Sequence, residues 1–169
     1  MSNLTDISDV IIIGSGPAGL SAAIYVVRAG LSVNVIEKEF MGTGQIADSS
    51  KVDNYLGIPA ISGYDLGESF REHALSLGVT IEDNNVTRLT PVDDIWELEL
   101  SDGSTKKARC VIYAAGCSHK KLQAENEEQY TGKGISYCAV CDGAFYKDKD
   151  VAVVGGGDTA LSDALYLSD

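Results

Sequence analysis

Apolar residues alternate between strand-like runs and helix-like repeats at the start of the chain. The run 10–13 is continuously apolar and β-branched, which is typical of a strand in a parallel sheet covered on both faces. Apolar residues at helical spacing follow over 17–29, with a proline in the first turn and Gly30 as the stop. The segment 32–36 then alternates into a second strand that ends at Glu37. These patterns predict one β-α-β unit.

The middle of the chain predicts a long connection, a helix and a hairpin. Residues 41–64 are rich in glycine, serine, aspartate and asparagine, so we expect a long irregular loop with a functional role. Apolar residues repeat at helical spacing over 66–77, and Gly78 ends them. Alternation over 96–100, a turn and the apolar run 110–114 predict a small antiparallel flap that rejoins the main sheet.

A second β-α start comes at the far end of the chain. Polar and charged residues over 118–133 indicate a boundary between domains. The apolar run 151–154 predicts a strand, and the residues up to 167 predict a helix. A doubly wound domain needs further β-α units, so we expect this sequence to be part of something longer.

The charge of the chain narrows its partners. The composition is that of a globular protein, with 44% hydrophobic and 22% charged residues among 169. Thirteen lysines and arginines against 25 aspartates and glutamates give a net charge of -12, which disfavours nucleic acid and anionic membranes. No basic residue precedes Arg28 and no apolar window reaches about 18 residues, so we expect no signal peptide, no membrane segment and a cytoplasmic location. There a disulfide is more often catalytic than structural.

Three glycines lie between the first predicted strand and helix. Gly14 permits a tight turn, Gly16 lets the backbone approach a pyrophosphate, and Gly19 lets the helix pack close to the strand. Glu37 lies 23 residues after Gly14, where a carboxylate can accept hydrogen bonds from ribose hydroxyls. The spacing predicts a dinucleotide site and makes a glycine turn without a ligand the weaker alternative.

The second apolar run leads into a similar pattern, Gly155, Gly157 and Ala160, with alanine at the packing position. Two such sites on one chain imply two cofactors that pass electrons. A turn without a ligand stays more open here, because no downstream strand shows a partner for the ribose.

Cys138 and Cys141 are the redox candidates. Their two-residue spacer lets the sulfurs close a small disulfide ring. Zinc is disfavoured because it needs a second close pair, and Cys110 and Cys117 are seven positions apart; we interpret these two as structural. Asp142 is either a proton donor and acceptor or a turn residue before a glycine.

Four segments, IIIGSGPAGLSAAIY, GTGQ with VDNYLGIP, CAVCDGAFY and VAVVGGGDTA, resemble the low-molecular-weight thioredoxin reductases in order and spacing, over essentially the whole chain. The resemblance implies a Rossmann-like FAD-binding domain over 1–117 and the start of an inserted, Rossmann-like nicotinamide-binding domain over 118–169. It implies a thioredoxin-disulfide reductase that works as a homodimer. Electrons would pass from NADPH through FAD and the Cys138/Cys141 disulfide to thioredoxin or a similar small disulfide protein.

The resemblance also implies roles for single residues. Cys141 would face the flavin, Cys138 would exchange with the partner, and Asp142 would be the acid. The FAD contacts would be Gly14, Ser15, Gly16, Pro17, Ala18, Glu37, Gln45, Asn54, Ala115 and Gly116. The nicotinamide contacts would be Gly156, Gly157, Asp158, Thr159 and Ala160.

The chain departs from the family pattern in two places that bear on flavin contact. Thr43 stands inside the usual Gly-Gly-Gln, and residues 114–117 read Ala-Ala-Gly-Cys where Ala-Thr-Gly-Ala is common. The motif that selects NADPH over NADH would lie after residue 169, so that choice follows the family. Two alternatives stay open: a related flavin disulfide oxidoreductase that uses ferredoxin or small dithiols, and a truncated, non-catalytic flavin-binding fragment. We expect little turnover from the 169-residue chain alone.

Overall fold

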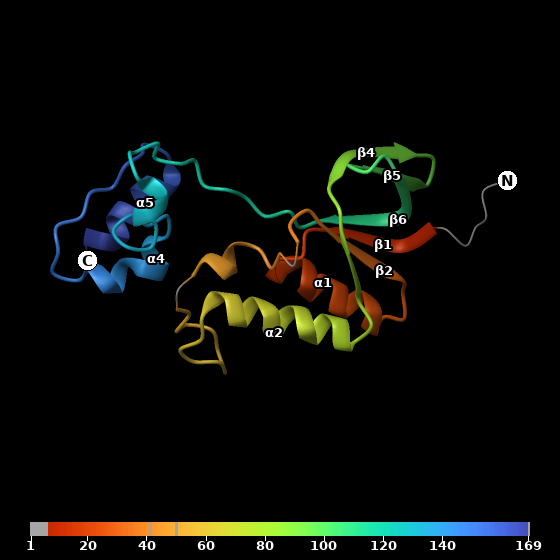
Figure 1. Cartoon of the computed structure of the whole chain (residues 1–169), viewed down its shortest axis with the longest axis horizontal. Helices are drawn as coiled ribbons and strands as arrows, with labels where there is room; N and C mark the ends of the chain where they lie inside the picture. The colour runs from red at the N-terminus through yellow and green to blue at the C-terminus, as the bar shows by residue number, and fades with distance from the viewer. Residues whose placement is uncertain (1–6, 41, 50, 169) are drawn as a thin grey trace. The chain divides into compact units, whose positions relative to one another are not determined.

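The structure, a computed structural model, describes residues 7–40, 42–49 and 51–168 (Figure 1). The chain falls into two compact units, one up to Cys117 and one from Ser118 onward. The first unit contains the sheet and two long helices, and the second contains shorter helices and connecting segments.

A six-stranded sheet forms the centre of the first unit. Its strands are β1 (Ile7–Ile13), β2 (Val33–Glu37), β3 (Thr80–Asp83), β4 (Val86–Val92), β5 (Ile95–Leu100) and β6 (Thr105–Tyr113). The order is β3-β2-β1-β6-β5-β4, so the first strand of the chain lies inside the sheet. β1 pairs in parallel with β2 and β6, and β2 with β3, whereas β5 pairs antiparallel with β4 and β6.

Both faces of β1 are covered, as its uninterrupted apolar run predicts. Two helices, α1 (Pro17–Arg28) and α2 (Gly63–Ser76), run along one face (Figure 1). Since successive side chains of a strand point to opposite faces, β1 contributes to two separate clusters. Val10 and Ile12 pack with Leu20 of α1, and Ile11 packs with Leu98 of β5. Because β1, β2, β3 and β6 are parallel, their carboxyl ends lie at the same edge of the sheet, and the loops that follow them meet there.

The α/β class and the first β-α-β unit are confirmed. The predicted strand, helix and second strand correspond to β1, α1 and β2, and Gly30 follows α1 with a φ of 76°. The predicted helix over 66–77 is α2, and β5 with β6 forms the predicted flap. The sequence analysis missed β3 and β4. β3 is a short, largely polar edge strand, and Pro91 and exposed polar residues obscure the alternation of β4.

The long connection between β2 and α2 is more ordered than expected. It contains the 3₁₀ helix η2 (Gln45–Asp48) and an isolated antiparallel bridge between Val52 and Ile61. α2 begins in close contact with this connection: a side chain at its first residue, Gly63, would collide with the carbonyl oxygen of Ile46.

The second unit contains α3 (Glu127–Tyr130), α4 (Ala139–Asp142), the 3₁₀ helix η3 (Gly143–Tyr146) and α5 (Asp158–Ser168). α5 confirms the helix predicted at the end of the chain. The strand predicted over 151–154 is wrong: no described segment pairs with it, and Val154 is 70% exposed. A strand is stabilised by hydrogen bonds to a neighbour and by packing of one face, and the described residues offer it neither. Across the described residues, no helix combines the length and apolar character that a membrane crossing requires.

Candidate functional site

Two glycines let the turn after β1 close tightly. Gly14 has a φ of 103°, and a side chain there would collide with the carbonyl oxygen of Ala114. A side chain at Gly19 would collide with the carbonyl oxygen of Gly14. Both positions need glycine so that β1, α1 and the end of β6 can pack together.

Gly16 differs, because the packing of the chain does not exclude a side chain there. It has a φ of -65°, and an added Cβ would lie 3.7 Å from its nearest neighbour, Gly44 Cα. Gly44 has a φ of 79°, and a Cβ added to it would lie 3.0 Å from Gly16 Cα. The two glycines leave bare backbone on both sides of the turn, which fits the close approach of a phosphate group.

The N-terminus of α1 is also suited to an anion. Gly16 is its N-cap without a side-chain cap, Pro17 starts the helix, and the first turn holds no acidic residue. A helix start carries unpaired amides and a partial positive charge. The bare turn and the uncapped helix together fit the pyrophosphate of a dinucleotide.

Glu37 lies at the end of β2 and is bonded to this turn. Its Oε2 accepts hydrogen bonds from the Ser15 amide at 2.7 Å and the Ser15 hydroxyl at 2.8 Å, and its Oε1 accepts from the Glu39 amide at 3.0 Å. Burial raises the pKa of Glu37, but these hydrogen bonds outweigh it and hold the pKa below its ordinary value. The carboxylate is therefore ionised at neutral pH, as an acceptor for ribose hydroxyls should be.

The remaining residues predicted to contact FAD lie partly together. Ala115 and Gly116 follow β6, and Ala115 lies beside the Gly14 turn. The side-chain amide of Gln45 donates to the carbonyl oxygen of Cys117, which joins η2 to the same end of β6. Asn54 is exposed, and no hydrogen bond between described residues joins its side chain to this group. Its contact with FAD, like the others, stays a prediction.

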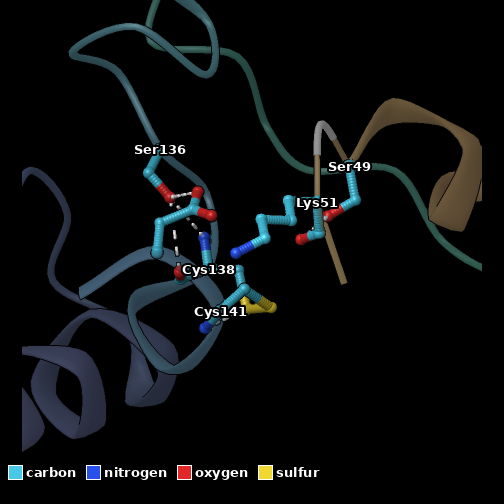
Figure 2. The surroundings of a disulfide bond; sticks show 6 residues. Ser49, Lys51, Ser136, Cys138 and Cys141 are labelled. Atoms are coloured by element: carbon cyan, nitrogen blue, oxygen red, sulfur yellow. Dashed lines mark hydrogen bonds between the residues drawn. A yellow bond between two sulfur atoms is a disulfide. The ribbon is translucent and has the colours of Figure 1, made fainter. Parts of the chain in front are cut away.

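The second unit contains the disulfide between Cys138 and Cys141, with their Cα atoms 5.3 Å apart (Figure 2). Cys138 is the N-cap of α4, and its sulfur accepts a hydrogen bond from the Cys141 amide at 3.2 Å. The Cys138 residue is half-buried, whereas Cys141 is exposed. An amide aimed at a sulfur stabilises the thiolate form of that sulfur once the disulfide is reduced.

Ser136 was missed by sequence reasoning, and it connects the disulfide to Asp142. Its hydroxyl oxygen accepts from the Cys138 amide at 3.1 Å and lies 2.5 Å from Asp142 Oδ2 (Figure 2). The Asp142 amide donates to the Cys138 carbonyl oxygen at 3.1 Å. Asp142 is therefore fixed by both its backbone and its side chain. A serine two residues before a redox cysteine was the available signal.

Glu127 and Tyr137 form a second group that the sequence analysis did not single out. Glu127 is 8% exposed and accepts hydrogen bonds from the Tyr137 hydroxyl and from the amides of Leu122 and Gln123. The hydrogen bond from Tyr137 lowers the pKa of Glu127, and in return Glu127 raises the pKa of Tyr137. The pair anchors the residue directly before Cys138.

The second glycine motif adopts a turn into α5. Gly155 has a φ of 139°, and an added Cβ would lie 3.1 Å from the Ala160 side chain. Gly156 and Gly157 have open space around them, and α5 begins at Asp158. The nicotinamide contacts predicted for Gly156, Gly157, Asp158, Thr159 and Ala160 stay predictions. Within the described residues no three histidine, cysteine or acidic side chains are grouped to hold a metal.

The two cysteines and the glycine turns agree with the result of comparison with known proteins. Residues 8–169 match the family described as pyridine nucleotide-disulphide oxidoreductase. The chain belongs to this family. A thioredoxin reductase of Mycoplasma genitalium is 43% identical over 162 residues, which cover 96% of this chain and 51% of that protein. The chain spans about half the length of the curated relatives it matches.

Solved structures from the same family share the fold. The thioredoxin reductase of Streptococcus pyogenes has a TM-score of 0.89 at 40% identity, covering 96% of this chain and 53% of that one. A ferredoxin-flavin thioredoxin reductase of Clostridium acetobutylicum has a TM-score of 0.64 at 36% identity, covering 96% of this chain and 56% of that one.

Thr43, the departure from the family's usual glycine pair, has a packing role in this family member. It is 4% exposed, and a side chain at Gly67 of α2 would collide with its hydroxyl oxygen. The small residue on the helix makes room for the larger one on the loop. The substitution therefore fixes the loop to α2 and leaves the bare backbone of Gly44 facing Gly16.

Proposed function

We propose that the chain is part of a thioredoxin-disulfide reductase, with FAD bound by residues 1–117 and the nicotinamide-binding domain beginning in 118–169. The observation that carries this proposal is the Cys138–Cys141 disulfide, bonded to Asp142 through Ser136. The glycine turn on the same chain, which fits a pyrophosphate, supports it. FAD, when bound, supplies two electrons that NADPH has delivered to it.

The first unit would hold the FAD through its backbone and one carboxylate. The bare backbone at Gly16 and the start of α1 would receive the pyrophosphate. Glu37 would accept the ribose hydroxyls, because it is an ionised carboxylate at the end of β2 whose oxygens can each accept more than one hydrogen bond. The other predicted contacts are Gly14, Ser15, Pro17, Ala18, Gln45, Asn54, Ala115 and Gly116.

The second unit would perform the disulfide exchange. Reduction of the Cys138–Cys141 bond takes up two electrons and two protons and gives two thiols. Cys138 then loses its proton to the Asp142 carboxylate, and its thiolate attacks one sulfur of the thioredoxin disulfide while the other thioredoxin sulfur leaves as a thiolate. Cys141 next loses its proton and attacks Cys138, the internal disulfide re-forms, and thioredoxin departs as a dithiol that carries this proton and the one held by Asp142. The Cys141 amide, 3.2 Å from the Cys138 sulfur, supports Cys138 as the attacking thiolate.

We also propose a homodimer located in the cytoplasm, on the basis of the family. The net charge of -12 is consistent with a small protein partner and disfavours nucleic acid and anionic lipid. A molecular-mass measurement in solution tests the dimer.

Trapping of a mixed disulfide tests the exchange step directly. In a background with Cys110→Ser and Cys117→Ser, which removes the two free, exposed cysteines, Cys141→Ser should form a stable mixed disulfide with oxidised thioredoxin after reduction. Cys138→Ser is the matched control and should trap far less, because Cys141 lacks the attacking role. Equal trapping by both variants, or by neither, would count against the assignment of Cys138.

Electron supply is tested with FAD and a donor. FAD should bind to the chain and change in fluorescence, and NADPH should reduce the bound flavin in a protein that extends this chain to the length of its relatives. A ferredoxin-linked reductase is a second candidate, because the Clostridium acetobutylicum neighbour is named for that donor. Flavin reduced by ferredoxin and not by NADPH would favour the second candidate.

A further inference from the structure

The Ser136 hydroxyl lies between the backbone of Cys138 and the carboxylate of Asp142 and is hydrogen-bonded to both. We propose that Ser136 is a positioning residue: it holds the Asp142 carboxylate where that carboxylate exchanges protons with the redox thiols. This inference rests on the proposed disulfide chemistry and adds a residue to it. We call residues 136–142 the redox loop.

The hydrogen bonds give Ser136 one orientation. The Cys138 amide supplies the hydrogen in its contact with Ser136 Oγ at 3.1 Å, so the hydroxyl keeps its own hydrogen for another acceptor. Asp142 Oδ2 lies 2.5 Å from that oxygen, whereas the Cys138 carbonyl oxygen lies at 3.3 Å. The shorter contact makes Asp142 the main acceptor.

The carboxylate would be mobile without this contact. The Asp142 backbone is fixed by its amide, which donates to the Cys138 carbonyl oxygen at 3.1 Å. Its side chain, half-buried at the end of α4, is still able to turn about two bonds. Ser136 removes that freedom, and holding a proton-transfer group in one geometry is what makes the transfer efficient.

Ser136 itself gains and loses nothing in the reaction. When the dithiol attacks a partner disulfide, the proton leaves a loop thiol for Asp142, the thiolate forms the new sulfur–sulfur bond, and the partner's second sulfur leaves. When the partner leaves, Asp142 passes that proton to the departing thiolate and is again free to accept one. The hydroxyl donates one hydrogen bond to the carboxylate throughout.

The pH profile of thiol alkylation tests the inference without any cofactor. The chain carries Cys110→Ser and Cys117→Ser, is reduced, and is treated with iodoacetamide from about pH 5 to 10, the range in which thiols titrate. Peptide mass spectrometry reports Cys138 and Cys141 separately. The variants are Ser136→Ala, Asp142→Asn and the two combined. Ser168→Ala is the matched control, because the Ser168 hydroxyl, away from the redox loop in sequence, donates to a carbonyl oxygen of its own helix at 2.8 Å.

We expect Ser136→Ala to move the alkylation midpoint of the loop thiols down by about half a pH unit, since a carboxylate released into water opposes a thiolate less. Asp142→Asn should move it in the same direction. Ser136→Ala should then add nothing in the Asp142→Asn background, because it acts through that carboxylate. An unchanged midpoint in Ser136→Ala, or an equal shift with and without Asp142, would overturn the inference.

Two further measurements distinguish a failure of this inference from misfolding and from a failure of the proposed function. Circular dichroism verifies that Ser136→Ala folds. If this variant does not fold, Ser136→Thr, which keeps a hydroxyl, is used instead. Its alkylation midpoint should equal that of the parent, and a different midpoint would overturn the inference. Trapping of thioredoxin by Cys141→Ser is read at completion and with Ser136 intact, so its outcome reports the proposed exchange and not the positioning by Ser136. If thioredoxin is trapped but Ser136→Ala does not shift the alkylation midpoint, only this inference is overturned. If the midpoint shifts but thioredoxin is not trapped, only the proposed function is overturned.

Discussion

Replacing Glu37 by glutamine should destabilise the first unit, because three donors converge on this one carboxylate. They are the Ser15 amide at 2.7 Å, the Ser15 hydroxyl at 2.8 Å and the Glu39 amide at 3.0 Å, around a residue that is 8% exposed. A glutamine can keep its oxygen toward Ser15, but its NH₂ group then faces the Glu39 amide. One charge-assisted hydrogen bond is lost and a buried donor is left facing another, so we expect a loss of about 2–3 kcal/mol.

Urea unfolding followed by tryptophan fluorescence measures this loss. Trp96, the single tryptophan of the chain, lies in β5 and therefore reports on the first unit. The unfolding midpoint of Glu37→Gln should fall by about 1–2 M urea. Glu39→Gln is the matched control: the Glu39 side chain is 71% exposed, and among the described residues its carboxylate pairs at 3.6 Å with the exposed Lys38. Its midpoint should hardly move, since exposed pairs contribute little.

The pH dependence gives a second, independent reading. The pKa of Glu37 is held below its ordinary value of 4.5, so its contribution to stability is present above that value and is lost as the pH falls through the lower, folded pKa. The gap between the parent and Glu37→Gln should therefore narrow below pH 4.5. The reasoning would be refuted if Glu37→Gln had the same urea midpoint as Glu39→Gln at pH 7, or if the difference in midpoint between the parent and Glu37→Gln did not change with pH.

Three further substitutions test other contacts. Gly67→Ala should lower the free energy of unfolding by about 1–3 kcal/mol through its collision with Thr43, and Thr43→Ala should restore part of it in a urea titration. Gly16→Ala should cost about 1 kcal/mol or less as an N-cap change, yet weaken FAD binding at least about tenfold in a fluorescence titration. Because Glu127 raises the pKa of Tyr137, absorbance titration should show a late tyrosine phase above pH 10 that is missing from Tyr137→Phe. An equal late phase in both proteins would exclude that assignment.

The sequence predicted the structure correctly at positions where close packing allows only one type of residue. Gly14 and Gly19 were assigned to a tight turn and to close helix packing, and collisions with the backbone explain both. The uninterrupted apolar run of β1 likewise predicted a strand covered on two faces. Gly19 meets a neighbour in the chain, and the turn at Gly14 and the strand β1 follow the general rules of β-α-β units in a covered sheet.

The missed features depend on partners far away in sequence or on side chains of ordinary type. Glu127 stands in an acidic run and was not singled out, and only the fold brings the Tyr137 hydroxyl and two amides to it. Thr43 looked like a departure until Gly67, 24 positions later, was seen to make room for it. The run 151–154 has the composition of a strand, but pairing also requires a neighbour.

The hydrogen bonds that join the disulfide, Ser136 and Asp142 all lie within the redox loop, and the longest spans six positions, whereas Tyr137 is bonded to Glu127 outside it. A seven-residue peptide thus encodes its own disulfide, its acidic group and the serine between them. Grafted onto an unrelated scaffold that fixes its two ends and anchors Tyr137 as Glu127 does here, such a segment should retain its thiol reactivity. Evolution could likewise exchange the surroundings of this loop while the chemistry stayed intact.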